Sequence, residues 1–187
     1  MTNPLGSDQP PVEAADMCVR ELLLSEVQIR IDYFHSSSDE HLAMLGVDRR
    51  LLPSRQAWQE IYEVDSARPI RERQHYTLAW EFDERIVGFS SLDRITYGEQ
   101  AFMHLHILVA PDRRVGMGAA FVKLSAAEYF RTFELRRLYC QPNAFNVAPN
   151  RTLQRAGFRY EFTKQLQPSA INPHQPVTRW VLDRPPG

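Results

Sequence analysis

Two histidines and two glycines stand close together just past the middle of the chain. The histidines are His104 and His106, and the glycines are Gly116 and Gly118, preceded by two arginines. Apolar residues recur at helical spacing from Met117 onward, so the glycines lie where a strand gives way to a helix. The free N–H groups of a helix start attract anions, and glycine lets a phosphate approach the backbone closely. The junction is therefore a candidate phosphate site.

A second interpretation of the glycines is structural. Gly116 and Gly118 could simply permit tight packing of the helix on the sheet. No Lys-Ser or Lys-Thr follows them, which excludes a P-loop, and the three-glycine dinucleotide fingerprint is missing. Arg113 and Arg114 add positive charge beside the turn, which favours an anion.

Apolar periodicity predicts the elements that position this junction. The predicted strands cover residues 19–24, 76–82, 86–95, 101–109, 137–141, 158–166 and 177–182. The predicted helices cover residues 25–35, 40–45, 54–62, 117–127 and 147–156. Capping residues support three of these boundaries, namely a capping box from Ser25 to Gln28, an N-cap at Ser54 and a helix end at Gly157. This order predicts a mixed α/β fold in which an antiparallel meander feeds one β-α-β crossover.

Length, charge and composition limit the classes of protein. The chain has 187 residues, which suits one domain, and 22 Lys and Arg against 23 Asp and Glu argue against nucleic-acid binding. No apolar run is long enough for a membrane span. Residues 1–16 are predicted to be a disordered leader, and residues 17–184 the domain. Two lone cysteines and the lack of a signal-peptide pattern predict a cytoplasmic protein.

The glycine junction and a second block together resemble the GNAT superfamily of N-acetyltransferases. The superfamily signature, Gln or Arg followed by x-x-Gly-x-Gly or x-x-Gly-x-Ala, is matched by Arg113-x-x-Gly116-x-Gly118. The second block runs from Asn146 through Pro149 to Gly157-Phe158, with spacing similar to the ribosomal-protein N-terminal acetyltransferases. The resemblance covers roughly residues 18–183. It implies a single-domain α/β acetyltransferase fold with a mixed, mostly antiparallel central sheet and helices on both faces.

The resemblance also implies a cosubstrate, acetyl-CoA, and the residues that would hold it. In the family, backbone N–H groups from Arg114 through Ala119 would bind the pyrophosphate, and the strand edge from His106 to Leu108 would pair with the pantetheine. The region of Asn146 would contact the other arm of the cofactor. The candidate cofactor residues are His106, Ile107, Leu108, Arg113, Arg114, Val115, Gly116, Met117, Gly118, Ala119, Asn146 and Asn150.

Acetyl transfer to an amine is helped by a general base or a water relay, because an alkylamine is almost wholly protonated near neutral pH. His104 and His106 alternate with Met103, Leu105 and Ile107, so the two imidazoles are expected on one strand face. They could equally be structural histidines, and a bulge, which is common at this place in the family, would shift the parity. Glu99 is a weaker candidate for the base, and His104 is preferred.

Leu153 departs from the family pattern. Many members carry a tyrosine there, thought to protonate the leaving thiolate, and leucine cannot. Tyr139 or water could substitute, or the thiolate, with a pKa of about 8.5, could leave without an acid. Tyr139 could also be a plain core aromatic.

The expected partners are acetyl-CoA and a small-molecule or peptide amine, without nucleic acid, membrane or metal. No histidine has a cysteine or carboxylate partner at convincing metal-ligand spacing. A homodimer stays open. The second hypothesis is a noncatalytic acyl-CoA-binding sensor or interaction module on the same fold, which the departure at Leu153 favours. Turnover of acetyl-CoA with any amine would distinguish the two.

Overall fold

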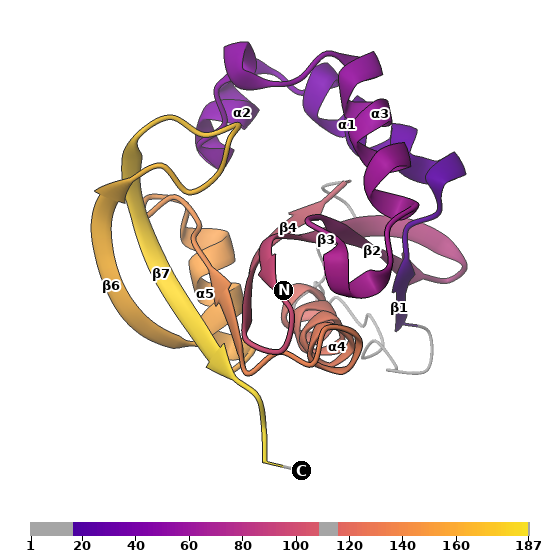
Figure 1. Cartoon of the computed structure of the whole chain (residues 1–187). Coiled ribbons are helices and arrows are strands. Elements are labelled where there is room, and N and C mark those ends of the chain that lie inside the picture. Colours follow the sequence, from indigo (N-terminus) through magenta and orange to yellow (C-terminus); the bar gives the residue numbers. More distant parts are fainter. Residues whose placement is uncertain (1–16, 109–115, 187) are drawn as a thin grey trace, which may run out of the picture.

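A computed structural model describes residues 17–108 and 116–186. This part of the chain forms an open seven-stranded sheet in the order β1-β2-β3-β4-β5-β7-β6 (Figure 1). The strands are β1 (Met17–Glu21), β2 (Tyr76–Phe82), β3 (Arg85–Thr96), β4 (Gln100–Ile107), β5 (Arg137–Cys140), β6 (Arg159–Leu166) and β7 (Gln175–Asp183). The helices are α1 (Val27–Ser36), α2 (Asp39–Leu45), α3 (Arg55–Ser66), α4 (Met117–Thr132) and α5 (Val147–Arg155), with three short 3-10 turns at 24–26, 49–51 and 70–72.

The order of these elements is the predicted one. Every neighbouring pair of strands is antiparallel except β4 and β5, which the helix α4 connects as a β-α-β crossover. The predicted leader, residues 1–16, lies outside the described residues. The mixed, mostly antiparallel sheet expected from the resemblance is thus confirmed.

Alternation along β2 places every second side chain on the sheet face that α4 covers. Tyr76, Leu78, Trp80 and Phe82 all belong to one buried cluster with residues of α4 and α5. The indole ring of Trp80 stacks flat on Phe121 of α4, with ring centroids 5.1 Å apart. Burying these large rings makes this face the main core of the domain.

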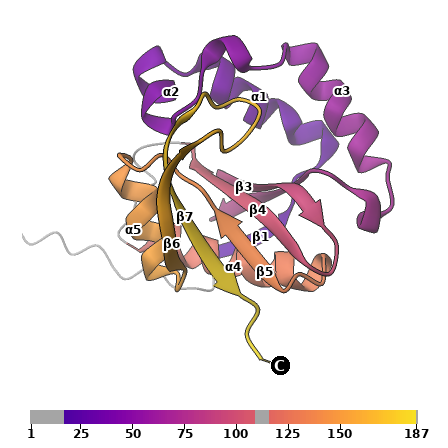
Figure 2. The same ribbon diagram turned by 60° about the vertical axis from the view of Figure 1, so that its left-hand side comes forward.

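Helices α1 and α3 cover the opposite face of the sheet. Phe34 of α1 and Trp58 of α3 pack against Phe89 of β3. Figure 2 shows α1, α2 and α3 on one side of the sheet and α4 on the other. The hydroxyl of Ser54 accepts the N–H of Ala57 at 3.1 Å, which confirms the predicted cap of α3.

The beginning of α1 differs from the prediction. Strand β1 ends before residue 22, and α1 starts two residues after the predicted Ser25. The carboxylate of Glu26 accepts the N–H of Leu23 at 2.9 Å and pairs with the guanidinium of Arg20 at 2.7 Å. These bonds hold residues 24–26 in a 3-10 turn, so the box predicted from Ser25 is wrong.

Strands β4 and β5 separate partway along their length. Their parallel pairing ends at Met103 with Cys140, whereas β4 stays paired with β3 up to Ile107. Alternate peptide groups of a strand point toward each neighbour, so residues 104–107 present an open edge on the β5 side. Their register with β3 is regular, and no bulge shifts the histidines from their predicted face.

Candidate active site

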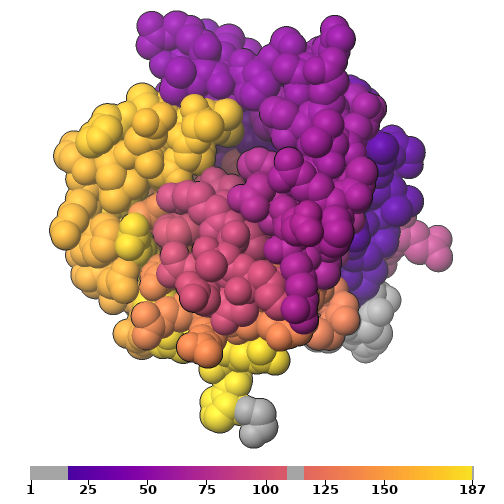
Figure 3. Space-filling view, viewed as in Figure 1, coloured from indigo at the N-terminus to yellow at the C-terminus, as the bar shows by residue number. Residues whose placement is uncertain are grey.

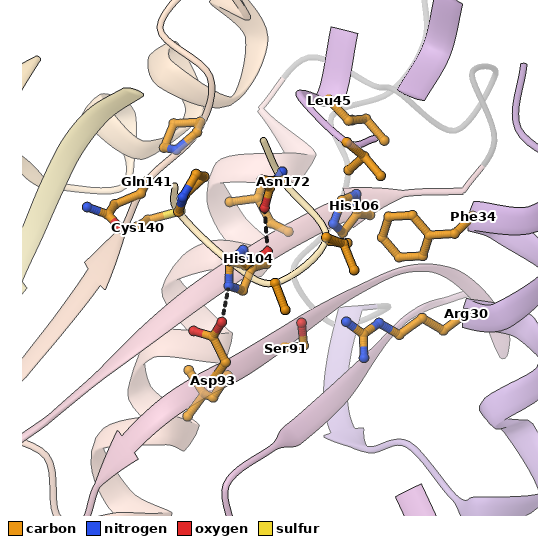
Figure 4. A pocket seen from close by; sticks show the side chains of 18 of the residues that line it. Arg30, Phe34, Leu45, Ser91, Asp93, His104, His106, Cys140, Gln141 and Asn172 are labelled. Carbon is orange, nitrogen blue, oxygen red and sulfur yellow. Dashed lines mark hydrogen bonds and ion pairs between the residues drawn. The ribbon is translucent and has the colours of Figure 1, made fainter. Parts of the chain in front are cut away.

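A cavity of about 250 Å³ lies beside the separation of β4 and β5. Figure 3 shows a hollow bounded by the β6–β7 segment, the N-terminal helices and β4, and Figure 4 shows its interior. The polar side chains along its wall include Arg30, Tyr62, His75, Ser91, Asp93, His104, His106, Gln141, Asn143, Asn146, Ser169, Asn172 and Gln175. Apolar side chains from α1, α3 and the β6–β7 segment complete the wall, a composition typical of a small-molecule site.

The segment between β6 and β7 is fastened to the end of α2 and closes one side of the cavity. The carbonyl oxygen of Gly46 accepts from the amides of Asn172, at 2.6 Å, and Gln175, at 2.7 Å. Gly46 has a φ of +73°, and a β-carbon there would come within 2.1 Å of the Gln175 amide oxygen. Only glycine meets both requirements, which explains the residue at this contact.

The imidazole of His104 and the carboxylate of Asp93 lie side by side across β3 and β4. Nε2 of His104 lies 3.2 Å from Oδ2 of Asp93, without the angle of a hydrogen bond (Figure 4). Burial alone would raise the pKa of Asp93, but the charges of His104 and Arg94 outweigh it and lower that pKa to about 2. The cavity therefore holds an ionised carboxylate against the imidazole at neutral pH.

His106 lies in an aromatic environment. Its ring centroid is 5.0 Å from those of Phe34 and Phe89 and 5.3 Å from that of Tyr33. Burial, together with the charge of Arg30, lowers the pKa of His106 well below 6.5. Its Nδ1 is enclosed and has no hydrogen-bond partner in the described part of the chain. His106 is therefore neutral and a weaker base than an exposed imidazole.

The predicted alternation along β4 is confirmed. Leu105 and Ile107 pack on the α4 side of the sheet, and His106 packs with α1 on the other. Glu99, the weaker candidate base, is exposed in the β3–β4 turn and does not line the cavity. Of the proposed bases, the structure brings the two histidines to the cavity, since Glu99 lies at the far end of the strand.

Tyr139 does not reach the cavity wall. Its ring stacks on Phe102, with centroids 5.1 Å apart, and both pack with Val181. The guanidinium of Arg179 lies over the Tyr139 ring at 5.4 Å. The role of leaving-group acid therefore does not fit this side chain, because strand pairing commits it to a buried stack. Leu153 is fully buried in the α4 cluster.

The start of α4 fits a phosphate cradle. Gly116 has a φ of +91°, and no atom lies within 4 Å of where its β-carbon would be, so the backbone conformation is what requires glycine. A β-carbon on Gly118 would meet Thr152 at 3.5 Å and Ile107 at 3.8 Å, both ordinary contacts. Gly118 thus faces α5 and β4, as the packing interpretation expects. Met117 is buried, and Ala119 is half-buried.

Three predicted cofactor residues, Arg113, Arg114 and Val115, lie outside the described residues. Ile107 and Leu108 end the open stretch of β4, and the N–H of Leu108 donates to the carbonyl of Val87 at 3.0 Å. The free edge of β4 and the glycine at the start of α4 both suit an extended cosubstrate with an anionic end. The residues present therefore fit acetyl-CoA.

The two predicted asparagines have different surroundings. Asn146 lines the cavity, and its amide donates to the carbonyl of Met44 at 3.1 Å. Asn150 donates to the carbonyls of Asn143 and Asn146 and accepts from the Trp180 indole at 2.8 Å. A cofactor contact by the Asn150 side chain is therefore unsupported, because its amide nitrogen braces the β5–α5 loop and its amide oxygen bonds Trp180 of β7.

Sequence reasoning missed Asp93 and Arg30. Arg30 stands three residues after Val27 and one before Ile31, on the buried face of α1, so a charge inside an apolar stripe was the available signal. Asp93 precedes the β3–β4 turn, and only the pairing of Ser91 with His104 places its carboxylate beside the imidazole.

Residues 17–108 and 116–186 hold neither a metal-binding cluster nor a membrane-spanning helix. They contain no group of three or more histidine, cysteine, aspartate or glutamate side chains placed to hold a metal ion. None of the helices in the same residues has the length and apolar character needed to cross a bilayer.

The fold, the open strand edge and the glycine-led helix are those expected of an acyl-CoA-dependent transferase. A family model described as the acetyltransferase (GNAT) domain matches residues 20–159. The chain belongs to the GNAT acetyltransferase family, and it is an acetyl-CoA-dependent N-acetyltransferase. No curated protein sequence matches it.

Solved structures share the fold at low sequence identity. RimL, a ribosomal L7/L12 α-N-protein acetyltransferase in complex with coenzyme A, is 14% identical with a TM-score of 0.71, over 92% of this chain and 96% of that one. The Salmonella typhimurium enzyme that modifies the N-terminal serine of L7/L12 is 14% identical with a TM-score of 0.70, over 94% and 98%. The aminoglycoside acetyltransferase AAC(6')-Ib with coenzyme A and kanamycin is 14% identical with a TM-score of 0.67, over 90% and 95%.

Proposed function

We propose that the enzyme transfers the acetyl group directly to a primary amine bound in the described cavity, with His104 as the general base. The observation that carries this proposal is the close contact of the His104 imidazole with the Asp93 carboxylate at the cavity wall. It lies where β4 loses its β5 partner, which is the edge that suits the pantetheine arm. Bound acetyl-CoA supplies the activated acetyl thioester.

His104 accepts the proton that the amine must lose. The Asp93 carboxylate faces Nε2, so in the neutral imidazole Nε2 carries the hydrogen and Nδ1 is the ring nitrogen left to accept a proton from the amine. The imidazolium then forms beside the Asp93 carboxylate, whose pKa of about 2 keeps it ionised and able to stabilise the positive charge. Asp93 thus acts as a positioning residue for His104.

His106 has a different task in this proposal. Because burial and Arg30 keep the pKa of His106 well below 6.5, its neutral ring is a poor proton acceptor at physiological pH. Its packing with Phe34 and Phe89 instead shapes the cavity and holds the β4 edge in place.

The leaving thiol needs no side-chain acid in this site. Leu153 is buried, and Tyr139 is stacked away from the cavity. A thiolate with a pKa of about 8.5 is a good leaving group without prior protonation. The departure from the family pattern at Leu153 is therefore compatible with turnover.

A cytoplasmic location and a homodimer stay predictions from the sequence.

The test measures release of coenzyme A from acetyl-CoA across a panel of primary amines. We expect turnover with at least one amine, and a fall of about 100-fold or more in turnover for His104→Gln with unchanged acetyl-CoA affinity. His106→Gln should fall less. His174→Gln is the matched control, because His174 is exposed and does not line the cavity.

Three results would contradict the proposal. If no amine supports turnover, the cavity is not an acceptor site. If His104→Gln keeps near-normal turnover, His104 is structural and the proton passes to water. Loss of acetyl-CoA affinity in parallel with rate would instead assign His104 to support of the cofactor strand.

A further inference from the structure

Arg30 brings a guanidinium into the wall of the cavity, and no carboxylate of the described residues pairs with it. It extends from α1, and its Cζ lies 5.3 Å from the ring centroid of Trp58, 5.6 Å from that of Tyr62 and 5.7 Å from that of Phe89. It donates to the hydroxyl of Tyr62. Its Nε is buried and has no hydrogen-bond partner in residues 17–108 and 116–186. The faces of the aromatic rings stabilise this cation, but they leave its Nε–H without a hydrogen-bond acceptor among the described residues.

The two charged side chains of the cavity wall that have a fixed sign differ in whether a counter-ion lies beside them. Among the described residues that line it, Arg30 is the only arginine or lysine, and Asp93 is the only aspartate or glutamate. Asp93 is already paired with His104 and Arg94. Arg30 has no ion pair with any described carboxylate. A desolvated cation without a counter-ion is costly, and an anionic group on a ligand would remove that cost.

Register sets the distance between Arg30 and the base. Phe89, Ser91 and Asp93 alternate along β3 and so share one sheet face, with Ser91 opposite His104. Arg30 lies over Phe89, two residues from Ser91, which corresponds to about 7 Å along the strand. Figure 4 shows Arg30, Ser91, His104 and Asp93 among the side chains that line this cavity.

We propose that the acceptor is an amine that also carries a carboxylate or phosphate group, and that Arg30 binds this anionic group while the amine faces His104. The inference rests on the proposed function. It gives the acceptor a zwitterionic character, with a short linker between its charges. Guanidinium groups bind carboxylate and phosphate oxygens through paired N–H donors, which suits either anion.

The same charges disfavour two other acceptor classes. A polycation such as kanamycin would need several carboxylates, and the described wall offers one, already paired. A simple neutral or monocationic amine would leave Arg30 without a counter-ion. The acceptor charge is therefore the property that separates the classes.

The experiment compares amines in pairs that differ only in the anionic group. The pairs are γ-aminobutyrate with its amide, phosphoethanolamine with ethanolamine, and a serine-initiated dipeptide with its C-terminal amide; kanamycin is added as a polycation. We expect kcat/KM at least tenfold higher for the anionic member of at least one pair. A preference confined to γ-aminobutyrate and the dipeptide identifies a carboxylate, and one confined to phosphoethanolamine identifies a phosphate.

Arg30→Met and Arg30→Lys test the residue itself. Arg30→Met should abolish the preference, lowering kcat/KM for the anionic amine at least tenfold while changing that for its uncharged partner less than threefold. Arg30→Lys should restore part of the preference. Arg50→Met is the matched control, because the Arg50 side chain is 89% exposed and its partner is the adjacent turn residue Asp48. Thermal melting checks that each variant is folded.

The outcomes separate this inference from the proposed function. Turnover with the amides, ethanolamine or kanamycin equal to that with the anionic amines would overturn the inference and leave acetyl transfer intact. An equal loss for every amine in Arg30→Met, in a folded protein, would also overturn it, because Arg30 would then be structural. No turnover with any amine would refute the proposed function itself.

Discussion

Asp93→Asn removes the charge that faces His104 with almost no change in side-chain shape. The pKa of Asp93 falls from the ordinary 3.8 to about 2 in the folded protein. At about 1.36 kcal/mol per pH unit, this corresponds to about 2 kcal/mol of preferential stabilisation of the carboxylate. The side chain is 18% exposed, so solvent screening takes little from this value. This value is a net one, because the charges of His104 and Arg94 both favour the carboxylate while burial opposes it.

The stability effect has a defined pH window. The folded-state pKa lies below the unfolded-state value, so the contribution is fully present above about pH 4 to 5 and is lost as the pH falls toward 2. Urea denaturation should therefore show Asp93→Asn less stable than wild type by up to about 2 kcal/mol at pH 7, with the difference shrinking below pH 4. Asp83→Asn, at an exposed turn where asparagine suits the positive φ, is the control.

The kinetic effect follows from the same number. If the whole coupling to the imidazolium is expressed in the transition state, about 2 kcal/mol corresponds to about a 30-fold loss of turnover. We expect a fall of tenfold to 30-fold in kcat with the KM for acetyl-CoA unchanged. Rates within twofold of wild type, together with the expected loss of stability, would show that Asp93 only supports the fold. An unchanged stability at pH 7 would refute the ion-pair reasoning altogether.

Two glycines near the open β4 edge give further predictions. Gly88→Ala should destabilise the domain by about 1–3 kcal/mol and lower turnover. The new β-carbon would lie 2.6 Å from the carbonyl oxygen of His106 and 2.9 Å from the ring of Trp80. Urea denaturation measures the loss of stability, and the coenzyme A assay measures the loss of turnover. Gly116→Ala should cost about 1 kcal/mol of stability through its positive φ and weaken acetyl-CoA binding in calorimetry, whereas Gly98→Ala, also at a positive φ but remote from the cavity wall, should cost stability alone. Unchanged affinity in Gly116→Ala would contradict a cofactor role for this turn.

The elements themselves could be predicted from local patterns. The period-two alternation from Tyr76 to Phe82 and the helical stripe from Met117 depend on neighbours in the chain, and both appear in the fold as expected. The glycine junction and the Asn146 block indicated the family for the same reason, because each motif lies within one short segment. The start of α1 was missed, since its boundary depends on Arg20 reaching Glu26 from a strand.

The site required contacts between distant segments. The alternation on β4 put His104 and His106 on one face, but it could not show that one imidazole meets a carboxylate while the other lies among aromatic rings. Tyr139 and Asn150 likewise have side chains that suit the roles predicted for them. In the fold, however, Tyr139 stacks on Phe102, and Asn150 accepts a hydrogen bond from Trp180.

The sequence by itself determined the order of the elements, the positions of the glycines and the family, because these depend on side-chain periodicity and backbone freedom over a few residues. Tertiary structure alone decided which groups meet in the cavity. The register of β3 on β4 aligns Asp93 with His104, and the packing of α1 on the sheet carries Arg30 into the wall. Such contacts join residues far apart in the chain, so their pKa values and charge balance arise only when the fold brings them together.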